Sequence, residues 1–298
     1  MPPATATATG STATIGRVPA TWRQALLLSR YQLRDYLRSR RFILMMAIVA
    51  AIGAILSFIL AYYHVSSLVV KGLVSSPDAF YGTLWGGIVY AVIVFAGIIF
   101  GGDAIAGEFQ NKTGYFLMGL PIRRATVYVG KFLAALGASV VAMVVYLVIL
   151  LANGAFYLHT AFLPVALFES FAIALLYLLA LLGAVFLFSS MFKNSLYAVL
   201  VVAVLFLFGF TLLQEAVVAL AKVEPWFIID YARSTIAYPF DSTLPAHVAT
   251  VTARGPDGRT TTSTVYSPTY PEGLAIMAGY FILTAIAGLF LFEREEFT

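Results

Sequence analysis

The sequence between residues 101 and 131 reads GGDAIAGEFQNKTGYFLMGLPIRRATVYVGK. This segment is charged and contains glycine and proline, and it lies between two apolar runs that are each long enough to cross a bilayer. A charged segment of this length between two membrane spans is predicted to be a loop at one membrane face. Such a loop is a place where a soluble protein can contact a membrane domain.

The composition of the whole chain is that of a membrane protein. Of its 298 residues, 61% are hydrophobic and 11% are charged, whereas about 25% are charged in a typical soluble domain. The chain has no cysteine, which excludes disulfides and thiolate chemistry. Residues 1–20 form a low-complexity tail rich in Ala and Thr, which we expect to be disordered and which lacks the apolar region of a signal peptide. The basic residues gather near the span ends, so no nucleic-acid partner is predicted.

Six apolar segments are long enough to be transmembrane helices, because a crossing helix needs about 20 apolar residues. The fourth and fifth are separated only by residues 191–194, so they must form a tight helical hairpin. The predicted fold is an all-α polytopic membrane protein whose six-span domain occupies residues 42–298. The predicted spans are 42–63, 83–102, 127–151, 162–190, 195–221 and 272–292.

The distribution of Lys and Arg predicts which side of the membrane each loop faces. With the N-terminus placed in the cytoplasm, thirteen of the 18 Lys and Arg residues lie on the inner side. Four of the remaining five lie in the loop 222–271, where the rule is weak because that loop is long. We therefore expect a multi-pass protein of the plasma membrane with both termini in the cytoplasm.

Residues 21–41 are predicted to form an amphipathic helix on the inner membrane surface, ahead of the first span. At helical spacing, one stripe carries arginines and an adjoining stripe carries apolar side chains. An Arg-rich amphipathic helix with a tryptophan is typical of the headgroup layer of a lipid bilayer. The alternative is a cytoplasmic extension of the first span. The side chains concerned are Trp22, Arg23, Arg30, Arg34, Arg38 and Arg41, with Leu26, Leu33 and Leu37.

The loop 222–271 is a sizeable polar insertion between the fifth and sixth spans and is expected to face outward. Residues 247–266 within it predict a β-hairpin, because two arms rich in Thr and Val flank the turn sequence GPDG at 255–258. An isolated hairpin is only marginally stable in water. We therefore expect this one to pack on the rest of the loop or on a second copy of the chain.

The sequence carries no constellation typical of an enzyme. The phosphate-binding pattern G-x-x-x-x-G-K-[ST] is absent, so the chain is not predicted to bind a nucleotide itself. The sequence before Asp103 is a poor match to an intramembrane aspartyl protease, which also needs a second aspartate within another span. His64, His159 and His247 are all expected at the outer side, but they lack metal-binding spacing, so no metal site is predicted.

Glu169 and Glu215 are the acidic residues that lie well inside predicted spans. Ionisable side chains at this depth are costly in a bilayer and usually face an internal cavity or each other. The two residues are therefore candidates for a polar point on a transport pathway. The alternative is that both side chains extend to the lipid headgroups at the outer face.

The segment after the second predicted span resembles the inner loop of ABC-2-type (type V) ABC exporter membrane subunits. The matching residues are Asp103-Ala-Ile-Ala-Gly-Glu108-Phe109 with Thr113, then Leu120-Pro121-Ile-Arg123-Arg124, then Gly130-Lys131. The C-terminal FEREEF sequence at 292–297 is also similar to family members. Gly114 departs from the family pattern, in which a β-branched or long residue is more usual.

This resemblance implies that residues 103–126 form a coupling loop whose short helix docks on a separate cytosolic ABC ATPase. It implies that 21–41 is a connecting, or elbow, helix, and that the permease pairs with a second copy of itself or with a sister chain. ATP and Mg²⁺ would be bound by the ATPase, and this chain would hold no cofactor. The site residues implied for the loop are Asp103, Glu108, Phe109, Thr113, Pro121, Arg123 and Arg124.

The function implied by the resemblance is that of an export permease for a substrate such as a lipid, a drug or an amphipathic peptide. The alternative is a membrane scaffold or sensor that a partner ATPase drives without transport. The two differ in whether a candidate substrate stimulates hydrolysis by that ATPase.

Glu108 is predicted to be ion-paired, because an acidic residue at the inner face runs against the basic bias there. The expected partner is a basic residue of the ATPase, or Arg123 or Arg124 in the same loop, and the alternative is local capping of the loop. The loop helix is expected to begin near Asp103 and to end before Pro121, since proline disfavours helix at the preceding residue.

Overall fold

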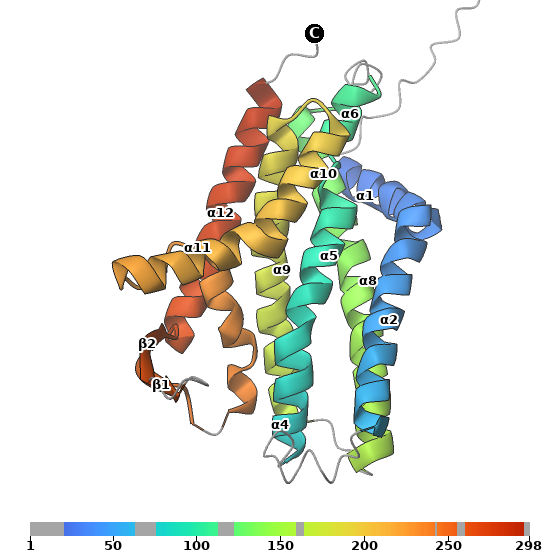
Figure 1. Ribbon diagram of the computed structural model, residues 1–298. Coiled ribbons are helices and arrows are strands. Elements are labelled where there is room, and N and C mark those ends of the chain that lie inside the picture. Colours follow the sequence, from blue (N-terminus) through green and yellow to red (C-terminus); the bar gives the residue numbers. More distant parts are fainter. Residues whose placement is uncertain are drawn as a thin grey trace, which may run out of the picture.

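The computed structural model is a bundle of long helices with one small two-stranded sheet (Figure 1). It describes residues 21–62, 76–112, 122–158, 164–241, 243–254 and 260–294. Among these residues, six helical segments are long and apolar enough to cross a membrane, which confirms the six predicted spans. They are Arg40–Tyr62, Pro77–Gln110, Arg124–Tyr157, Val165–Met191, Ser195–Ala221 and Tyr270–Arg294.

Two of the six spans, the second and the fifth, are built from more than one helical element, and three short π-helical segments interrupt them. In chain order the elements are α1 (Thr21–Arg38), α2 (Arg40–Tyr62), α4 (Pro77–Tyr81), η1 (Gly82–Gly86), α5 (Gly87–Gly101), α6 (Ala106–Gln110), α8 (Arg124–Leu158), α9 (Val165–Met191), α10 (Ser195–Val204), η2 (Leu205–Gly209), α11 (Phe210–Ala216), η3 (Val217–Ala221), η4 (Ile229–Ile236), η5 (Tyr238–Phe240), β1 (Val248–Arg254), β2 (Thr260–Tyr266) and α12 (Tyr270–Arg294).

α1 lies across one end of the bundle, at a large angle to α2 (Figure 1). It ends at Arg38, and the break at Ser39 is stabilised by a hydrogen bond of 2.7 Å from the Ser39 hydroxyl to the Tyr36 carbonyl. The predicted range 21–41 was therefore too long, and Arg41 belongs to the first span. The alternative of a continuous extension of that span is wrong, because the chain changes direction at this break.

One face of α1 packs against α8 through glycines that allow the two helices to approach closely. A Cβ atom at Gly130 would lie 2.6 Å from Leu28, and one at Gly137 would lie 3.3 Å from Leu33. Tyr36 is buried on the same helix and donates a hydrogen bond of 3.1 Å to the Phe100 carbonyl. Burial, followed by the nearby negative charge of Asp103, raises the pKa of Tyr36, so its hydroxyl remains a donor.

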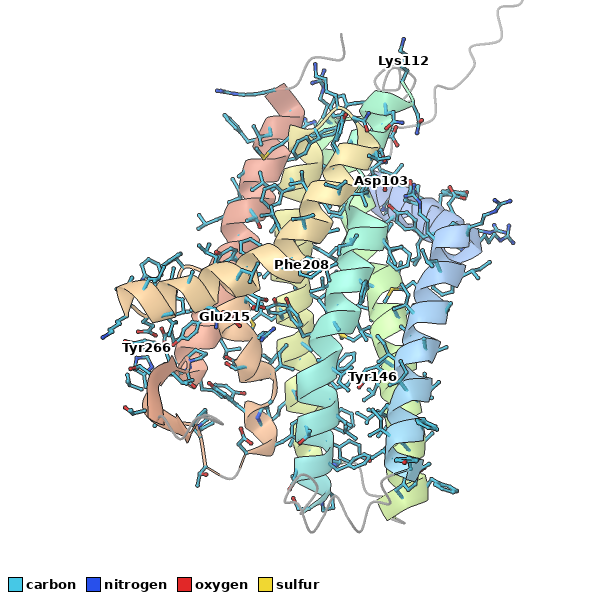
Figure 2. All side chains as sticks on the ribbon, viewed as in Figure 1. Asp103, Lys112, Tyr146, Phe208, Glu215 and Tyr266 are labelled. Atoms are coloured by element: carbon cyan, nitrogen blue, oxygen red, sulfur yellow. The ribbon has the colours of Figure 1, made fainter. Side chains whose placement is uncertain are left out.

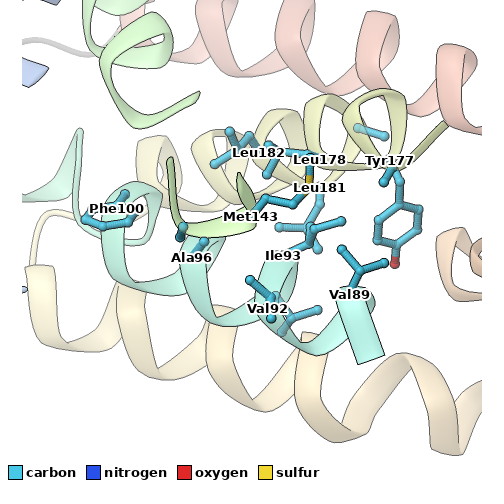
Figure 3. Packing of buried hydrophobic residues seen from close by; sticks show 14 of the residues in the cluster. Val89, Val92, Ile93, Ala96, Phe100, Met143, Tyr177, Leu178, Leu181 and Leu182 are labelled. Carbon is cyan, nitrogen blue, oxygen red and sulfur yellow. The ribbon is translucent and has the colours of Figure 1, made fainter. Parts of the chain in front are cut away.

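The core of the bundle lies between α5, α8 and α9 (Figure 3). Glycines of the second span face α9, where a Cβ atom at Gly97 would collide with Leu181 and one at Gly101 would lie 2.8 Å from Val185. Small residues at these positions let the two helices pack closely, as expected in membrane bundles. The side chains that fill this contact include Val89, Val92, Ile93, Ala96, Phe100, Met143, Tyr177, Leu178, Leu181 and Leu182.

The fourth and fifth spans form the predicted tight hairpin, since α9 ends at Met191 and α10 begins at Ser195. The side chain of Asn194 caps α10 by accepting a hydrogen bond of 2.9 Å from the Leu196 amide. Beyond η2 the fifth span bends, and α11 runs sideways out of the bundle (Figure 1). A π-helical turn is a known cause of such bends.

The loop 222–271 contains the predicted β-hairpin, in which β1 and β2 pair antiparallel with Val248 opposite Tyr266. The turn predicted at 255–258 lies outside the described residues. The rest of the loop is less exposed than its polarity suggested. η4 and η5 return to the bundle and pack on α9 and α12, which buries Asp230 and Thr235.

Candidate functional site

α6 stands at one end of the bundle, which we call the α6 end, and this end also carries α1 and the C-terminus of α12 (Figures 1 and 2). α6 has only five residues, Ala106–Gln110, and a turn continues it to Lys112. The helix predicted to run from near Asp103 toward Pro121 thus begins slightly later. Residues 113–121, which include the predicted site residues Thr113 and Pro121, lie outside the described part of the chain.

Asp103 connects the start of this segment to the first span. The two terminal guanidinium nitrogens of Arg41, Nη1 and Nη2, donate hydrogen bonds of 2.6 Å to the two carboxylate oxygens of Asp103. The Asp103 side chain is 10% exposed and that of Arg41 is 50% exposed. A bidentate pair of this kind fixes the orientation of both side chains as well as their distance.

Asp103 and Gln110 also connect the segment to the fifth span, at the N-terminus of α10. The Ser195 hydroxyl donates a hydrogen bond of 3.0 Å to the Asp103 carboxylate, and the Ser195 amide donates one of 2.7 Å to the Gln110 side-chain oxygen. The first amides of a helix have no partner within the helix. α6 therefore supplies one of the acceptors that the start of α10 needs.

Glu108 pairs with Lys131 of α8, at 2.5 Å between Nζ and a carboxylate oxygen. The same Nζ donates a hydrogen bond of 2.8 Å to the Ala104 carbonyl. Glu108 is therefore ion-paired, as predicted, and Lys131 is a partner that the prediction did not name. Arg124 donates a hydrogen bond of 3.0 Å to the Glu293 carbonyl.

The segment also contacts the fourth and sixth spans. The Ser189 hydroxyl of α9 accepts hydrogen bonds from the Ile105 and Ala106 amides, at 3.1 and 3.2 Å. On the other side, the ring of Phe109 meets the ring of Phe292 of α12 edge-on, with 6.3 Å between centroids. The residues around α6 thus form direct contacts with α2, α8, α9, α10 and α12.

The outward surface of this segment is polar and exposed among the described residues. Gln110, Asn111 and Lys112 are exposed, and Arg123 is exposed on the other side of the loop. Lys112 has a φ of 57°, a left-handed conformation that ends the helix. A partner that pressed on this surface would move a short element joined to five spans.

The predicted arginine stripe of α1 is exposed at Arg23, Arg30, Arg34 and Arg38, and Trp22 is 61% exposed. Leu26 and Leu37 are exposed as well, whereas Leu33 packs against the core. The free face of α1 therefore presents arginines together with apolar side chains, which is the combination that suits a lipid headgroup layer.

Glu169 of α9 and Glu215 of α11 both have exposed side chains, and Figure 2 labels Glu215 on the helix that leaves the bundle. Neither forms an ion pair among the described residues. Their role on a transport pathway stays a prediction.

Sequence reasoning missed Lys131, Ser189 and Ser195 as members of this site. A signal for Lys131 was present, because a lysine inside a predicted span needs a polar partner. The two serines carried no such signal, since serine is common in membrane helices and only the packing of α9 and α10 brings these two to α6.

A family model described as "ABC-2 family transporter protein" matches residues 26–297 of this chain. The match begins within α1 and includes all six spans. No curated protein matches the chain.

Proposed function

Because the chain belongs to the ABC-2 family of transporter membrane proteins, we propose that it is the permease subunit of an ATP-driven exporter. A separate cytosolic ABC ATPase binds ATP and Mg²⁺ and docks on the α6 end. This chain contributes no catalytic residue to hydrolysis. It converts the movement of the ATPase into a rearrangement of the spans.

The observation that carries this proposal is the set of contacts around α6. Two ion pairs, Arg41–Asp103 and Glu108–Lys131, join the segment to α2 and α8, and hydrogen bonds join it to α9 and α10. The outward side chains of the same segment are exposed. A short polar helix with this arrangement is suited to receive a force at the membrane surface and distribute it to several spans.

The α6 end then faces the cytoplasm, together with both termini, and the β-hairpin faces outward. The arginines of α1 support this orientation, because Lys and Arg near span ends favour the cytoplasmic side. In this arrangement α1 acts as the connecting helix, with its exposed arginines among the lipid headgroups.

A second copy of the chain, or a sister permease, covers the fifth span in the assembled transporter. This span exposes large apolar side chains along α10 and η2, while the first four spans bury more of theirs. Homomeric assemblies with two-fold symmetry are the commonest oligomers. The exposed side chains are Leu196, Tyr197, Leu200, Val204, Leu207 and Phe208.

An amphipathic or lipid-like substrate fits the cavity that opens beside the Arg41–Asp103 pair. The cavity has a volume of about 620 Å³ and lies between α2, α5 and α10. Its walls are mostly apolar, and the ion pair lies at one side. The apolar lining includes Leu44, Ile98, Ile99, Val199 and Leu200.

Charge reversal at Lys112 tests the docking surface. We expect Lys112→Glu to weaken binding of the co-purified ATPase by about tenfold, or ~1.4 kcal/mol. Lys222→Glu is the matched control, because Lys222 is also an exposed lysine with a positive φ at the end of a helix, but lies near the hairpin. Equal binding by both variants, measured by titration in nanodiscs, would show that the ATPase docks elsewhere.

Exchange of the Glu108–Lys131 charges tests the transmission of force. Removal of one partner leaves a buried charge and costs about 3–5 kcal/mol, so Glu108→Gln should lose substrate-stimulated ATP hydrolysis while Lys112 still permits docking. The exchange Glu108→Lys with Lys131→Glu should restore part of that stimulation. If the single variant keeps full stimulation by a transported lipid analogue, the pair is only structural.

A further inference from the structure

At the opposite end of the bundle, Glu224, His247 and Glu272 come together from three separate segments. Glu224 follows the fifth span, His247 directly precedes β1, and Glu272 lies in the first turn of α12. One ligand atom from each of the three residues lies within 4.8 Å of the other two. The Nε2 atom of His247 is 3.3 Å from a carboxylate oxygen of Glu224.

The hydrogen bond at Nδ1 shows that this ring nitrogen of His247 carries a hydrogen. Nδ1 lies 2.9 Å from the Ser267 carbonyl oxygen, which can only accept, so Nδ1 carries the hydrogen. In a neutral ring, Nε2 then presents a lone pair toward the negative oxygen of Glu224. Two such acceptors at 3.3 Å repel each other unless Nε2 binds a second proton or a metal ion.

The cluster is short of positive charge. With a neutral His247, two carboxylates contribute two negative charges, and within the described residues no Lys or Arg forms an ion pair with either one. Both carboxylates are also held in place. The Tyr231 hydroxyl donates a hydrogen bond of 2.6 Å to Glu224, and the Thr269 amide donates one of 3.1 Å to Glu272.

We propose that Glu224, His247 and Glu272 form a binding site for a divalent transition metal ion of the Zn²⁺ type. One imidazole and two carboxylates suit Zn²⁺ or Mn²⁺, whereas Ca²⁺ and Mg²⁺ prefer oxygen ligands alone. Zinc ligands at about 2.1 Å in tetrahedral geometry lie roughly 3.4 Å from one another. The separation between His247 Nε2 and Glu224 already matches this value. Glu272 lies 3.9 Å from the other ring nitrogen, Nδ1, so its side chain would have to move toward Nε2 to bind the same ion.

The support around each ligand is the kind found at metal sites. A ligating histidine usually donates its second ring nitrogen to a carbonyl or carboxylate, and ligating carboxylates accept further hydrogen bonds. The Ser267 carbonyl, Tyr231 and Thr269 fill these roles here. Sequence reasoning missed the site because its ligands are more than twenty residues apart and only the fold brings them together.

A bound ion would connect the end of the fifth span, the hairpin and the sixth span. The hairpin and the end of the fifth span already touch, since the Tyr266 hydroxyl donates a hydrogen bond of 2.8 Å to the Lys222 carbonyl. Leu220, Ala221 and Lys222 at the end of the fifth span are exposed. The ion would therefore restrain an exposed part of the chain.

The test is Zn²⁺ and Mn²⁺ titration of the full chain, purified with a tag that contains no histidine. We expect one strong site for Zn²⁺, and at least about tenfold weaker binding in His247→Gln and in Glu272→Gln. His159→Gln and Glu215→Gln are the matched controls and should bind as the parent does. Zn²⁺ should also raise the melting temperature of the parent, but not that of His247→Gln.

X-ray absorption at the zinc edge needs no variant and therefore remains informative if a substitution prevents folding. We expect one nitrogen and two or more oxygen ligands at about 2.0–2.2 Å. The proposal is overturned if the parent chain binds Zn²⁺ no more tightly than His247→Gln does, or if the absorption spectrum of the bound ion lacks an imidazole ligand.

Discussion

The fourth and fifth spans have the same length and the same mean hydropathy, yet they occupy different environments. Each has 27 residues, both have the same mean hydropathy, and they are joined by a short turn. In the most apolar part of the fourth span, 61% of the residues are buried inside the chain, and in the fifth span only 17% are. α9 forms the centre of the bundle, while the chain from α10 to η3 lies along its outside and bends away (Figure 1).

Hydropathy therefore indicates that a helix lies in the membrane, but it does not indicate whether the helix packs against other helices or against lipid. A leucine gains as much on leaving water whether it then meets lipid or another helix, because lipid tails are as apolar as leucine. What separates the two spans is the presence of small residues in a partner helix. Gly97 and Gly101 of α5 leave room for side chains of α9. The atoms nearest to these two glycines belong to α9 and not to α10.

The largest expected effect comes from truncating a leucine in the fourth span. Leu181 is fully buried against α5, so Leu181→Ala should lower the free energy of unfolding by about 2–5 kcal/mol. Leu200 of α10 is 53% exposed, and Leu200→Ala should lower that of the isolated chain by less than about 1 kcal/mol. Both are measured by unfolding in mixed detergent micelles with increasing SDS.

Equal losses in the two variants would contradict the comparison, because they would place the fifth span in the core of a single chain. A larger loss for Leu200→Ala in the assembled transporter than in the isolated chain would sharpen it. That outcome would show that a second permease, rather than lipid, covers this face of α10.

The parts of the fold that depend on the transfer of apolar side chains out of water could be predicted from the sequence. The six spans and the two strands of the hairpin follow from local composition, and all are present. The end of α1 was predicted too late because the break at Ser39 depends on a local hydrogen bond. The helical pattern in the sequence continues past Ser39 into the first span and gives no sign of this break.

The candidate site was predictable only in part, since the loop was identified from its charge but its internal partners were not. Glu108 was expected to pair, yet the choice of Lys131 depends on the rotation of α8 and on how α6 meets it. In the same way, Asp103 and Arg41 are far apart in the sequence and meet because α2 and α5 are neighbours. Such pairs depend on helix rotation, which a single sequence does not reveal.

A second prediction uses one glycine from each span. A Cβ atom at Gly183 of α9 would lie 2.5 Å from Thr284 Oγ1, which is itself hydrogen-bonded to the Tyr280 carbonyl, so there is no room. Gly183→Ala should therefore destabilise the chain by about 1–3 kcal/mol. At Gly209 the nearest atom is 3.3 Å away on Leu205, a side chain of the same helical segment.

Gly209→Ala should leave stability unchanged or raise it by up to about 1 kcal/mol, because alanine favours helix over glycine. Thermal unfolding in detergent, followed by circular dichroism, measures both variants. A loss at Gly209 as large as that at Gly183 would mean that the fifth span is packed more tightly than its exposure indicates.

A third and smaller effect concerns how the two spans begin. Asn194 caps α10 with its side chain, so Asn194→Ala should cost about 1 kcal/mol. α9 begins after Pro164, which provides no side-chain hydrogen bond. Pro164→Ala should therefore change helix stability little through capping. Hydrogen exchange of the first-turn amides separates the two cases, with faster exchange expected only in α10. Unchanged exchange in Asn194→Ala would show that contacts with α6 alone hold this helix start.

The smallest expected effect on folding comes from the acidic residue that each span carries. Glu169 and Glu215 are exposed and form no ion pair among the described residues, so glutamine at either position should change the free energy of unfolding by no more than about 0.5 kcal/mol. Transport should distinguish them, because α11 continues the fifth span, which we expect a second permease to cover, whereas α9 is central to one chain. We expect Glu215→Gln to reduce substrate-stimulated ATP hydrolysis and Glu169→Gln to reduce it less, measured with the complete transporter in vesicles. If both variants transport at the parental rate, the two carboxylates extend to the lipid headgroups. The acidic residues of the two spans would then not differ in their role in transport.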